Sequence, residues 1–195
     1  MDNENCPGIN KHCKIYGCVG RADCRRELPR ILILGHGRHG KDTVGELLEP
    51  YGFVTGCSSS FMAQYVRDYL ENHGIVYYPD AWKAWNNRHK YRKSWFDAIQ
   101  EYNKGDPARM CRELMASHDV YTGLRSAAEY EASTHLFDLV IWVDASKRHD
   151  LEPKSSMELE YDPRTMEYID NNGTLDELAQ HVDYLIQDYW PELCE

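Results

Sequence analysis

The chain has 195 residues, which is enough for one well-formed core, and its formal net charge is −10. An acidic total argues against indiscriminate adhesion to nucleic acid, although a local basic surface could still bind it. No apolar run reaches the roughly 18 residues that a membrane span needs, and the first residues lack the apolar core of a signal peptide. We therefore expect a cytoplasmic protein with no membrane partner.

Residues 1–29 form a cysteine-rich segment ahead of one larger domain, residues 30–195. Four of the 7 cysteines lie in this segment: Cys6, Cys13, Cys18 and Cys24. In a cytosolic chain such a cluster indicates a thiolate Zn²⁺ site more than disulfides, because a segment this short has little core of its own. The spacings lack a CxxC knuckle, so an arm with reduced thiols stays an equal alternative.

The stretch from Ile31 to Thr43 reads ILILGHGRHGKDT and predicts a buried strand, a glycine loop and the start of a helix. Such a loop turns backbone N–H groups around an anion, and the helix N-terminus adds a positive dipole end. We expect ATP phosphates to bind Gly35, His36, Gly37, Arg38, His39, Gly40, Lys41, Asp42 and Thr43. Lys41 would neutralise the outer phosphates and should lie outside the core.

The motif is a Walker A loop with one departure, because Asp42 stands where a hydroxyl normally meets Mg²⁺. Asp42 could bind the ion directly, bind it through water, or accept a proton. Alternatively, Thr43 supplies the metal-facing hydroxyl from one position further on.

After this loop, residues 52–57 predict a second strand, and Ser58, Ser59 and Ser60 follow its end. They either cap the next helix or line an acceptor pocket. The aromatic stretch 77–103 then carries five basic residues and no acidic one between positions 83 and 93: Lys83, Arg88, Lys90, Arg92 and Lys93. Interleaved cations and aromatic rings are typical of a DNA-binding surface, whereas an amphipathic helix pair with Trp82 and Trp95 in its core is the alternative.

Residues 107–118 predict a helix, and residues 120–124 a short strand that ends at Arg125, a candidate phosphate contact. Another helix follows over 127–135, and the apolar run 138–143 predicts a buried parallel strand ending at Asp144, shortly before Arg148. Residues 150–163 are polar and predict a mobile lid. The last strand falls at 166–169 and the last helix starts near Leu175. Five strands alternating with helices predict an α/β fold, a parallel sheet with helices on both faces.

Several segments of the domain resemble the phage 5-hydroxymethyluracil DNA kinases, which are grouped with thymidylate-kinase-like and phage deoxynucleoside monophosphate kinases. The segments are GHGRHGKDT, YTGLRS, WVDASKRH, EPKSSMELEYDP and DNNGTLDEL. The resemblance implies a P-loop kinase fold, ATP and Mg²⁺. It also implies transfer of the γ-phosphoryl group to the hydroxymethyl group of 5-hydroxymethyluracil in phage DNA, in the cytoplasm of an infected bacterium.

On that resemblance, the catalytic residues would be Lys41, Asp42, Arg125, Asp144 and Arg148, with Asp42 and Asp144 as candidate proton acceptors. Gly123 departs from nucleotide kinases, which often carry an aspartate near the end of that strand. Two alternatives stay open: a deoxynucleoside monophosphate kinase, and an ATP-dependent DNA-binding module without transfer chemistry.

Overall fold

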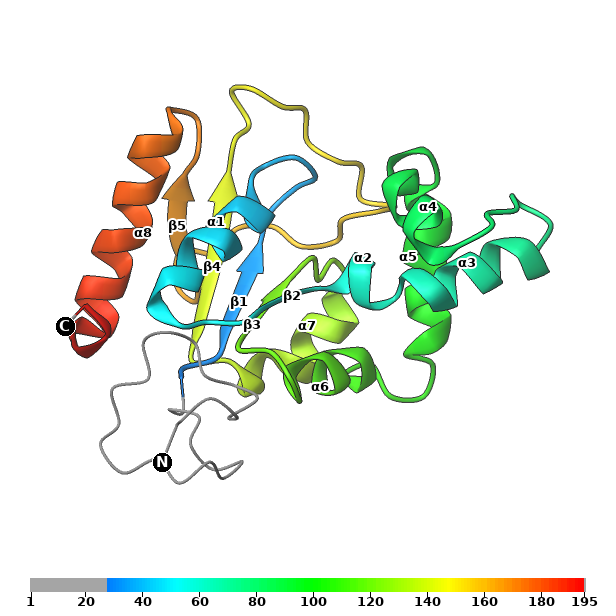
Figure 1. Ribbon diagram of the computed structural model, residues 1–195, viewed down its shortest axis with the longest axis horizontal. Coiled ribbons are helices and arrows are strands. Elements are labelled where there is room, and N and C mark those ends of the chain that lie inside the picture. The colour runs from blue at the N-terminus through cyan, green and yellow to red at the C-terminus, as the bar shows by residue number, and fades with distance from the viewer. Residues whose placement is uncertain (1–27, 195) are drawn as a thin grey trace, which may run out of the picture.

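The structure is a computed structural model that describes residues 28–194 (Figure 1). The four cysteines of the predicted zinc site, Cys6, Cys13, Cys18 and Cys24, lie outside the described residues. Among the residues that are described, no helix is long and apolar enough to cross a membrane.

Five parallel strands form one sheet in the order β2-β3-β1-β4-β5. Their bounds are β1 Ile31–Leu34, β2 Thr55–Cys57, β3 Val120–Thr122, β4 Leu139–Asp144 and β5 Glu167–Asp170. The register sets Ile31 beside Val120 on one side and beside Leu139 on the other. Because all strands are parallel, the loops that follow β1, β3 and β4 meet at one edge of the sheet. The predicted five-stranded parallel sheet is confirmed.

Two strands are shorter than the sequence predicts, and a glycine explains each difference. β2 begins at Thr55 because a 3-10 turn, Glu49–Tyr51, runs into Gly52, whose φ of 97° no strand residue adopts. β3 ends at Thr122 because Gly123 has a φ of 99°. A Cβ at Gly123 would also lie 2.4 Å from the hydroxyl of Ser58, so this position needs glycine on two grounds.

Helices α1 (Lys41–Leu48) and α8 (Leu175–Tyr189) cover one face of the sheet, on the left in Figure 1. The alternation within β1 shows how the two faces are used. Ile31 and Ile33 pack on Val44 of α1 and Val182 of α8, whereas Leu32 and Leu34 belong to the core on the opposite face. Helix α8 begins with a capping box. The Thr174 hydroxyl accepts a hydrogen bond from the backbone N–H of Glu177, and the Glu177 carboxylate accepts one from the backbone N–H of Thr174.

The opposite face is covered by the helices between β2 and β4, on the right in Figure 1. They are α2 Ser58–Phe61, α3 Ala63–Asn72, α4 Ala81–Asn86, α5 Arg92–Tyr102, α6 Arg109–Met115 and α7 Ala127–Ser133, with 3-10 turns Arg88–Lys90 and Thr134–Leu136. Helices on both faces match the prediction, although the helix expected over 107–118 is shorter. Figure 1 shows α3, α4 and α5 projecting beyond the sheet as a subdomain of their own.

Residues 150–163, the predicted lid, contain no helix or strand. The segment is nevertheless anchored, because Met157 and Leu159 are buried in the core and the N–H of Glu158 donates to the carbonyl of Arg125 at 3.0 Å. Any motion of this segment is therefore limited to the residues before Met157.

Candidate active site

The glycine loop between β1 and α1 is held open by residues in left-handed conformation. Gly40, the N-cap of α1, has a φ of 91°, and Arg38 has a φ of 69°, the one positive φ of a non-glycine residue among the residues described. A Cβ at Gly35 would lie 2.4 Å from the carbonyl oxygen of Val143, so the loop passes directly against β4. A glycine loop of this kind before a helix can form a cradle for an anion, and the N–H of Gly37 already donates to a carboxylate.

Lys41 lies inside this cradle, and its side chain is only 8% exposed, which corrects the expectation that it lies outside the core. Its Nζ donates to the carbonyl of His36 at 2.6 Å. Burial, followed by the nearby positive charge of Arg125, lowers the pKa of Lys41 to about 8. An anion bound in the loop would therefore stabilise the protonated form of Lys41.

Nucleotide affinity is expected to fall as pH rises from 7 to 9. The protonated amine attracts phosphates and the neutral amine does not, so binding is strongest below the pKa of about 8 and weakens above it. Calorimetric titration with ADP across this range measures the effect, which cannot exceed tenfold per pH unit for one proton. The matched control is Lys41→Arg, whose guanidinium stays charged and should bind ADP with a flat profile. A flat profile in the unmodified protein would contradict this role of Lys41.

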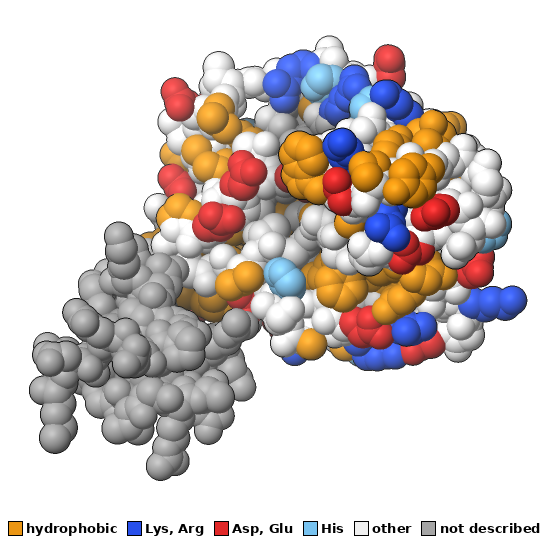
Figure 2. All heavy atoms as spheres, turned by 45° about the vertical axis from the view of Figure 1, so that its right-hand side comes forward, with side chains coloured by type: hydrophobic (Ala, Val, Ile, Leu, Met, Phe, Trp, Pro, Cys, Tyr) orange, Lys and Arg blue, Asp and Glu red, His pale blue; other side chains and the backbone are white. Residues whose placement is uncertain are grey.

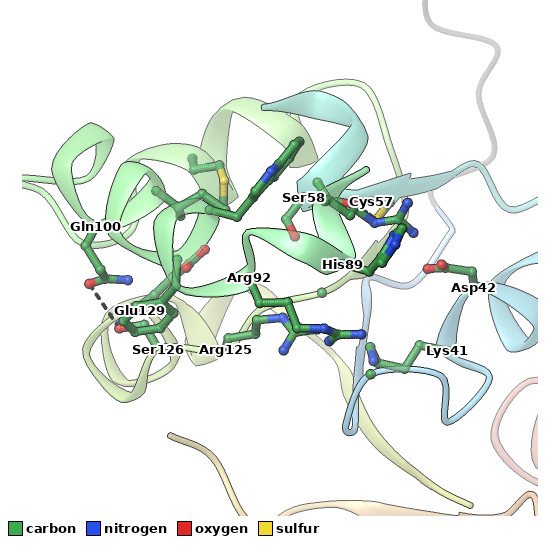
Figure 3. A pocket seen from close by; sticks show the side chains of 18 of the residues that line it. Lys41, Asp42, Cys57, Ser58, His89, Arg92, Gln100, Arg125, Ser126 and Glu129 are labelled. Atoms are coloured by element: carbon green, nitrogen blue, oxygen red, sulfur yellow. Dashed lines mark hydrogen bonds between the residues drawn. The ribbon is translucent and has the colours of Figure 1, made fainter. Parts of the chain in front are cut away.

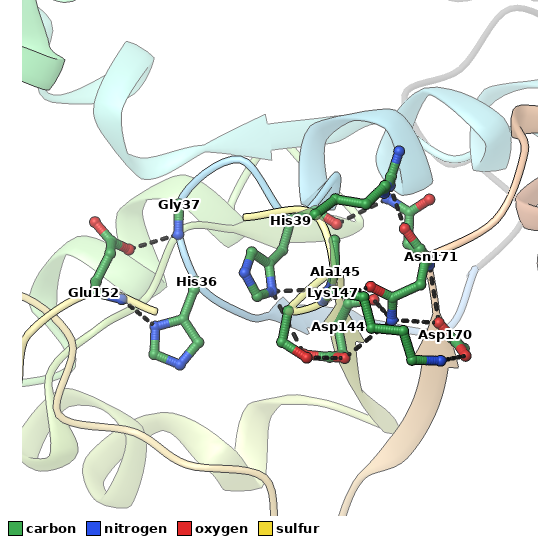
Figure 4. Close-up of polar contacts among 12 residues, drawn as sticks. His36, Gly37, His39, Asp144, Ala145, Lys147, Glu152, Asp170 and Asn171 are labelled. Carbon is green, nitrogen blue, oxygen red and sulfur yellow. Dashed lines mark hydrogen bonds and ion pairs between the residues drawn. The ribbon is translucent and has the colours of Figure 1, made fainter. Parts of the chain in front are cut away.

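A carboxylate already occupies part of the cradle. Glu152, from the segment 150–163, accepts a hydrogen bond from the N–H of Gly37 at 2.6 Å (Figure 4). It pairs with Arg125 at 2.5 Å. It also pairs with Arg92, and its side chain is 8% exposed. Burial alone would raise the pKa of Glu152, but Arg125, Arg92 and the Gly37 N–H together hold it below its usual value. Glu152 thus presents a negative oxygen where the loop would hold phosphate.

Replacing Glu152 is expected to tighten nucleotide binding, because a phosphate and this carboxylate compete for the same N–H and guanidinium groups. For Glu152→Gln we expect roughly a tenfold lower dissociation constant for ADP, which corresponds to about 1.4 kcal/mol. The matched control is Glu160→Gln in the same segment, where the side chain is exposed and pairs only with Lys154. Unchanged or weaker ADP binding by Glu152→Gln would show that the carboxylate organises the site and does not compete for it.

Asp144 lies on the other side of the loop from Glu152 (Figure 4). It accepts hydrogen bonds from Ser146 at 2.8 Å and Tyr168 at 3.0 Å, and lies 3.7 Å from Nδ1 of His39. His39 is fully buried, and burial lowers its pKa, so the ring is neutral and accepts the N–H of Ala145. These contacts hold the Asp144 carboxylate at the ends of β4 and β5, and its role as a proton acceptor stays a prediction.

Arg148 lies beside this network and donates to the carbonyl of Asn171. Asn171 in turn donates to the carbonyl of His39 at 2.9 Å, and a Cβ at Gly40 would lie 2.2 Å from its Nδ2 atom. Arg148 is thus connected to the loop through Asn171 and does not line the pocket described below.

Asp42 accepts a hydrogen bond from the hydroxyl of Thr122 at 3.1 Å. In the usual P-loop arrangement the hydroxyl comes from the loop and the carboxylate from the neighbouring strand. Here the carboxylate is on the loop and the hydroxyl is at the end of β3, so the two groups have exchanged elements. This exchange accounts for both sequence departures, Asp42 in the loop and the missing aspartate at Gly123.

The exchanged pair fits a Mg²⁺ ion, which takes one or two carboxylate ligands and completes its shell with water and phosphate oxygens. Asp42 is exposed and Thr122 is buried, so the carboxylate is the accessible member of the pair. Residues 28–194 contain no cluster of 3 or more His, Cys, Asp or Glu side chains that could hold a metal by themselves. Thr43, the alternative hydroxyl, is half-buried and does not line the pocket.

A pocket of about 340 Å³ opens directly from the loop, between the sheet edge and helix α5 (Figure 3). Lys41, Arg92 and Arg125 lie at its loop end, and Figure 3 shows Gln100, Ser126 and Glu129 together at the far end. Trp95, Phe96 and Ile99 supply apolar lining. Ser58 and Ser59 line the pocket as well, whereas Ser60 does not. That the pocket takes the acceptor stays a prediction.

The five basic residues predicted to bind DNA do not share one surface. Arg88 and Arg92 line the pocket, and Arg88 also lies over the Trp85 ring, 4.3 Å from its centroid. Lys83 and Lys90 are exposed, and Lys93 is exposed in an ion pair with Asp97. In the view of Figure 2, Lys and Arg side chains gather beside histidine side chains along the upper edge of the molecule.

Sequence reasoning missed the residues at the far end of the pocket and the acidic residue in the loop. Gln100, Ser126, Glu129 and Glu152 were not among the predicted site residues. The signal available for Glu129 was a glutamate in a short helix just after the strand ending at Arg125, which is weak on its own. Glu152 could not be found, because 115 positions separate it from Gly37.

No protein-family model and no curated protein sequence matches the chain. Solved structures with a similar fold include an unliganded sugar kinase from Janibacter sp. HTCC2649, with 14% identity, a TM-score of 0.44, and 85% of this chain and 97% of that chain covered. A Thermus thermophilus protein has 15% identity, a TM-score of 0.46, and coverage of 83% and 98%. A gluconokinase from Sinorhizobium meliloti 1021 has 17% identity, a TM-score of 0.40, and coverage of 86% and 99%.

These similarities are too weak to assign a reaction. The fold class stands on the chain's own features: five parallel strands in the order β2-β3-β1-β4-β5, and a phosphate-binding loop between β1 and α1. The described residues 28–194 form an α/β fold with a glycine-rich loop of the Walker A type between β1 and α1 and a pocket beside that loop.

Proposed function

We propose that the protein is an ATP-dependent kinase that phosphorylates the hydroxymethyl group of 5-hydroxymethyluracil in DNA. The observation that carries the proposal is the pocket, which starts at Lys41 with cationic side chains and ends at Gln100 and Glu129 with uncharged or acidic ones. This polarity fits an acceptor that brings a reacting oxygen to the loop and a hydrogen-bonding ring to the far end.

In the proposed step, the hydroxymethyl oxygen attacks the γ-phosphorus of ATP and forms a new P–O bond. The bond between that phosphorus and the β,γ-bridging oxygen breaks, and ADP leaves with the electron pair. Asp42 lines the pocket and can accept the proton of the alcohol. Lys41, Arg92 and Arg125 stabilise the charge on the transferred group, which is most of what phosphoryl transfer requires.

Mg²⁺ would be held by Asp42, with the Thr122 hydroxyl beside it, and would supply neutralisation of phosphate charge. If Asp42 binds the ion through a water molecule, it can also accept the proton of the alcohol. Binding of the ATP phosphates would require the carboxylate of Glu152 to leave the N–H of Gly37, so the segment 150–156 is a candidate gate.

DNA binding is supported by exposed aromatic and basic residues around α4. Trp82 is 68% exposed and Tyr77 is 67% exposed, whereas Trp95 is buried in the core. The alternative of an amphipathic helix pair therefore holds for Trp95 and not for Trp82. Lys83 and Lys90 are exposed as well. Aromatic rings that stack on bases and lysines that contact phosphates are the usual means of gripping an unpaired strand.

The deciding experiment is incubation with γ-labelled ATP and either hydroxymethyluracil DNA or free deoxynucleoside monophosphates. Label on the DNA base supports the proposal. DNA affinity should fall steeply with salt, and the double variant Lys83→Ala/Lys90→Ala should flatten the log–log slope by about one unit per lost phosphate contact. ATP hydrolysis stimulated by DNA with no labelled acceptor would instead identify a DNA-binding module without transfer chemistry.

A second candidate is a deoxynucleoside monophosphate kinase, and one observation favours it. Arg88, Arg92 and Arg125 all line the pocket, and three guanidinium groups suit the phosphate of a free nucleotide. Label on free monophosphates and none on hydroxymethyluracil DNA would establish this candidate.

A further inference from the structure

One carboxylate connects helix α5 to the glycine loop. Arg92, the first residue of α5, pairs with Glu152, and the same carboxylate pairs with Arg125 at 2.5 Å. A Cβ at Gly37 would lie 2.3 Å from Nη1 of Arg92, so this guanidinium lies directly against the loop. Figure 3 shows the side chains of Arg92 and Arg125 together beside Lys41. Two guanidinium groups from different elements therefore share one anion at the place where nucleotide phosphates would bind.

The position of the Glu152 carboxylate depends on both arginines. Its side chain is only 8% exposed, and a carboxylate this buried needs paired positive charge to offset the lost hydration. If another anion took Arg92, Glu152 would keep only Arg125 and the N–H of Gly37. The chain around it is free to yield, because Leu151 is 61% exposed and lies in an irregular stretch. Loss of one arginine would therefore favour movement of the carboxylate into water.

The pocket contains a second arginine that could bring such an anion to Arg92. Arg88 lines the pocket together with Arg92, and it forms no ion pair within residues 28–194. Its Nη1 donates to the carbonyl of Trp85 at 3.1 Å, and its guanidinium lies over the ring of the same residue. A guanidinium without a counter-anion is a ready partner for phosphate oxygens. Because both arginines line one pocket, a phosphate drawn in by Arg88 would come within reach of Arg92.

We propose that a phosphate of the acceptor displaces Glu152 from Arg92 and so opens the loop to ATP, which makes acceptor and nucleotide strengthen each other's binding. The inference rests on the proposed function for the acceptor, a DNA strand, and goes beyond it by coupling the two substrates. One ion pair is exchanged for another, and no covalent bond changes. Glu152 blocks the loop until an acceptor is present, and this limits the hydrolysis of ATP by water.

The direction of the coupling separates this mechanism from simple electrostatics. Two anions bound side by side repel each other, so an acceptor phosphate would by itself weaken nucleotide binding. With Glu152 in the loop, the acceptor phosphate drives one negative charge out as it brings another in, and the N–H of Gly37 becomes available. Coupling between two sites is reciprocal, so the nucleotide must raise the affinity for the acceptor by the same factor.

The test measures the dissociation constant of ADP with and without a saturating single-stranded DNA that contains 5-hydroxymethyluracil. ADP has no γ-phosphoryl group, so no transfer occurs. In the unmodified protein we expect the DNA to lower this constant roughly tenfold, within the usual range of coupling between sites. In Glu152→Gln the loop is open from the start, so the effect of DNA should fall below about threefold. Glu160→Gln, whose exposed side chain lies in the same segment, is the matched control and should keep the full effect.

If Glu152→Gln fails to fold, Arg92→Gln is used in its place. It removes the guanidinium through which the exchange occurs, so the effect of DNA should again fall below about threefold. DNA that binds and leaves the affinity for ADP unchanged or weaker overturns the inference while the kinase stands. DNA that does not bind overturns the proposed function.

Thymidine monophosphate is the second probe, because its phosphate is a monoester and the DNA phosphates are diesters. Tightening of ADP binding by thymidine monophosphate and not by DNA would support the exchange at Arg92 and establish the free nucleotide as the acceptor. Failure of both probes to tighten ADP binding, with either of them bound, overturns the inference.

Discussion

Lys41→Met is expected to abolish phosphoryl transfer while leaving the fold intact. The lysine is buried where the loop meets α1, and it lines the pocket that would hold the acceptor. Removal of a single group that stabilises transition-state charge typically costs about 10²–10³ in kcat. Methionine is chosen because Lys41 is buried, so an apolar side chain of similar length keeps the packing that alanine would lose. Labelled-phosphate transfer measures the loss.

The matched control is Lys104→Met, which removes an exposed lysine that does not line the pocket, and it should retain full activity. Circular dichroism of both variants checks that each one is folded. Retention of more than about a tenth of the activity by Lys41→Met, roughly a 1.4 kcal/mol loss, would falsify the assignment of this loop to ATP phosphates.

The sheet and the loop could be predicted because their signals are local. Apolar runs such as those of β1 and β4 alternate with helical patterns, and the glycines and Lys41 follow β1 in the order that a phosphate loop requires. The ends of β2 and β3 were predicted less well. Gly52 delays the start of β2 and Gly123 ends β3, because each has a positive φ that the sequence alone does not reveal.

The pocket could be predicted only in part, because its residues come from distant elements. Arg125 and two serines were found, since each follows the end of a strand. Glu152 was missed because its contacts with Gly37 and Arg92 depend on how an irregular segment crosses the sheet edge. The basic stretch was treated as one surface, yet the turn of the chain at residues 88–90 points Arg92 into the pocket and leaves Lys83 outside.

Asp42→Asn is expected to lower kcat by roughly a hundredfold or more without weakening DNA binding. Asp42 is the carboxylate that lines the pocket beside Lys41, whether it accepts the proton of the alcohol or holds Mg²⁺. Asp144→Asn serves as the comparison. Because Asp144 bonds Ser146 and Tyr168 and does not line the pocket, its amide should lower the melting temperature and keep kcat within about threefold.

The two possible roles of Asp42 can be separated by moving the carboxylate from the loop to β3. The double variant Asp42→Ser/Thr122→Asp places a hydroxyl on the loop and a carboxylate on the strand, across a contact that is 3.1 Å long in the protein. If Asp42 holds the metal, the double variant should recover at least tenfold of the activity lost in Asp42→Asn. The affinity of the double variant for MgADP, measured separately, should also return toward that of the unmodified protein.

If Asp42 accepts the proton of the alcohol and does not hold the metal, Asp42→Asn should bind MgADP as the unmodified protein does. The double variant should then recover no kcat, because a carboxylate moved to β3 no longer lies on the loop beside the reacting oxygen. Thr122→Asp alone is the control, and should bind MgADP no better than the unmodified protein, since two adjacent carboxylates repel each other. Full activity of Asp42→Asn together with a loss in Asp144→Asn would assign the role to Asp144 and contradict both readings of Asp42.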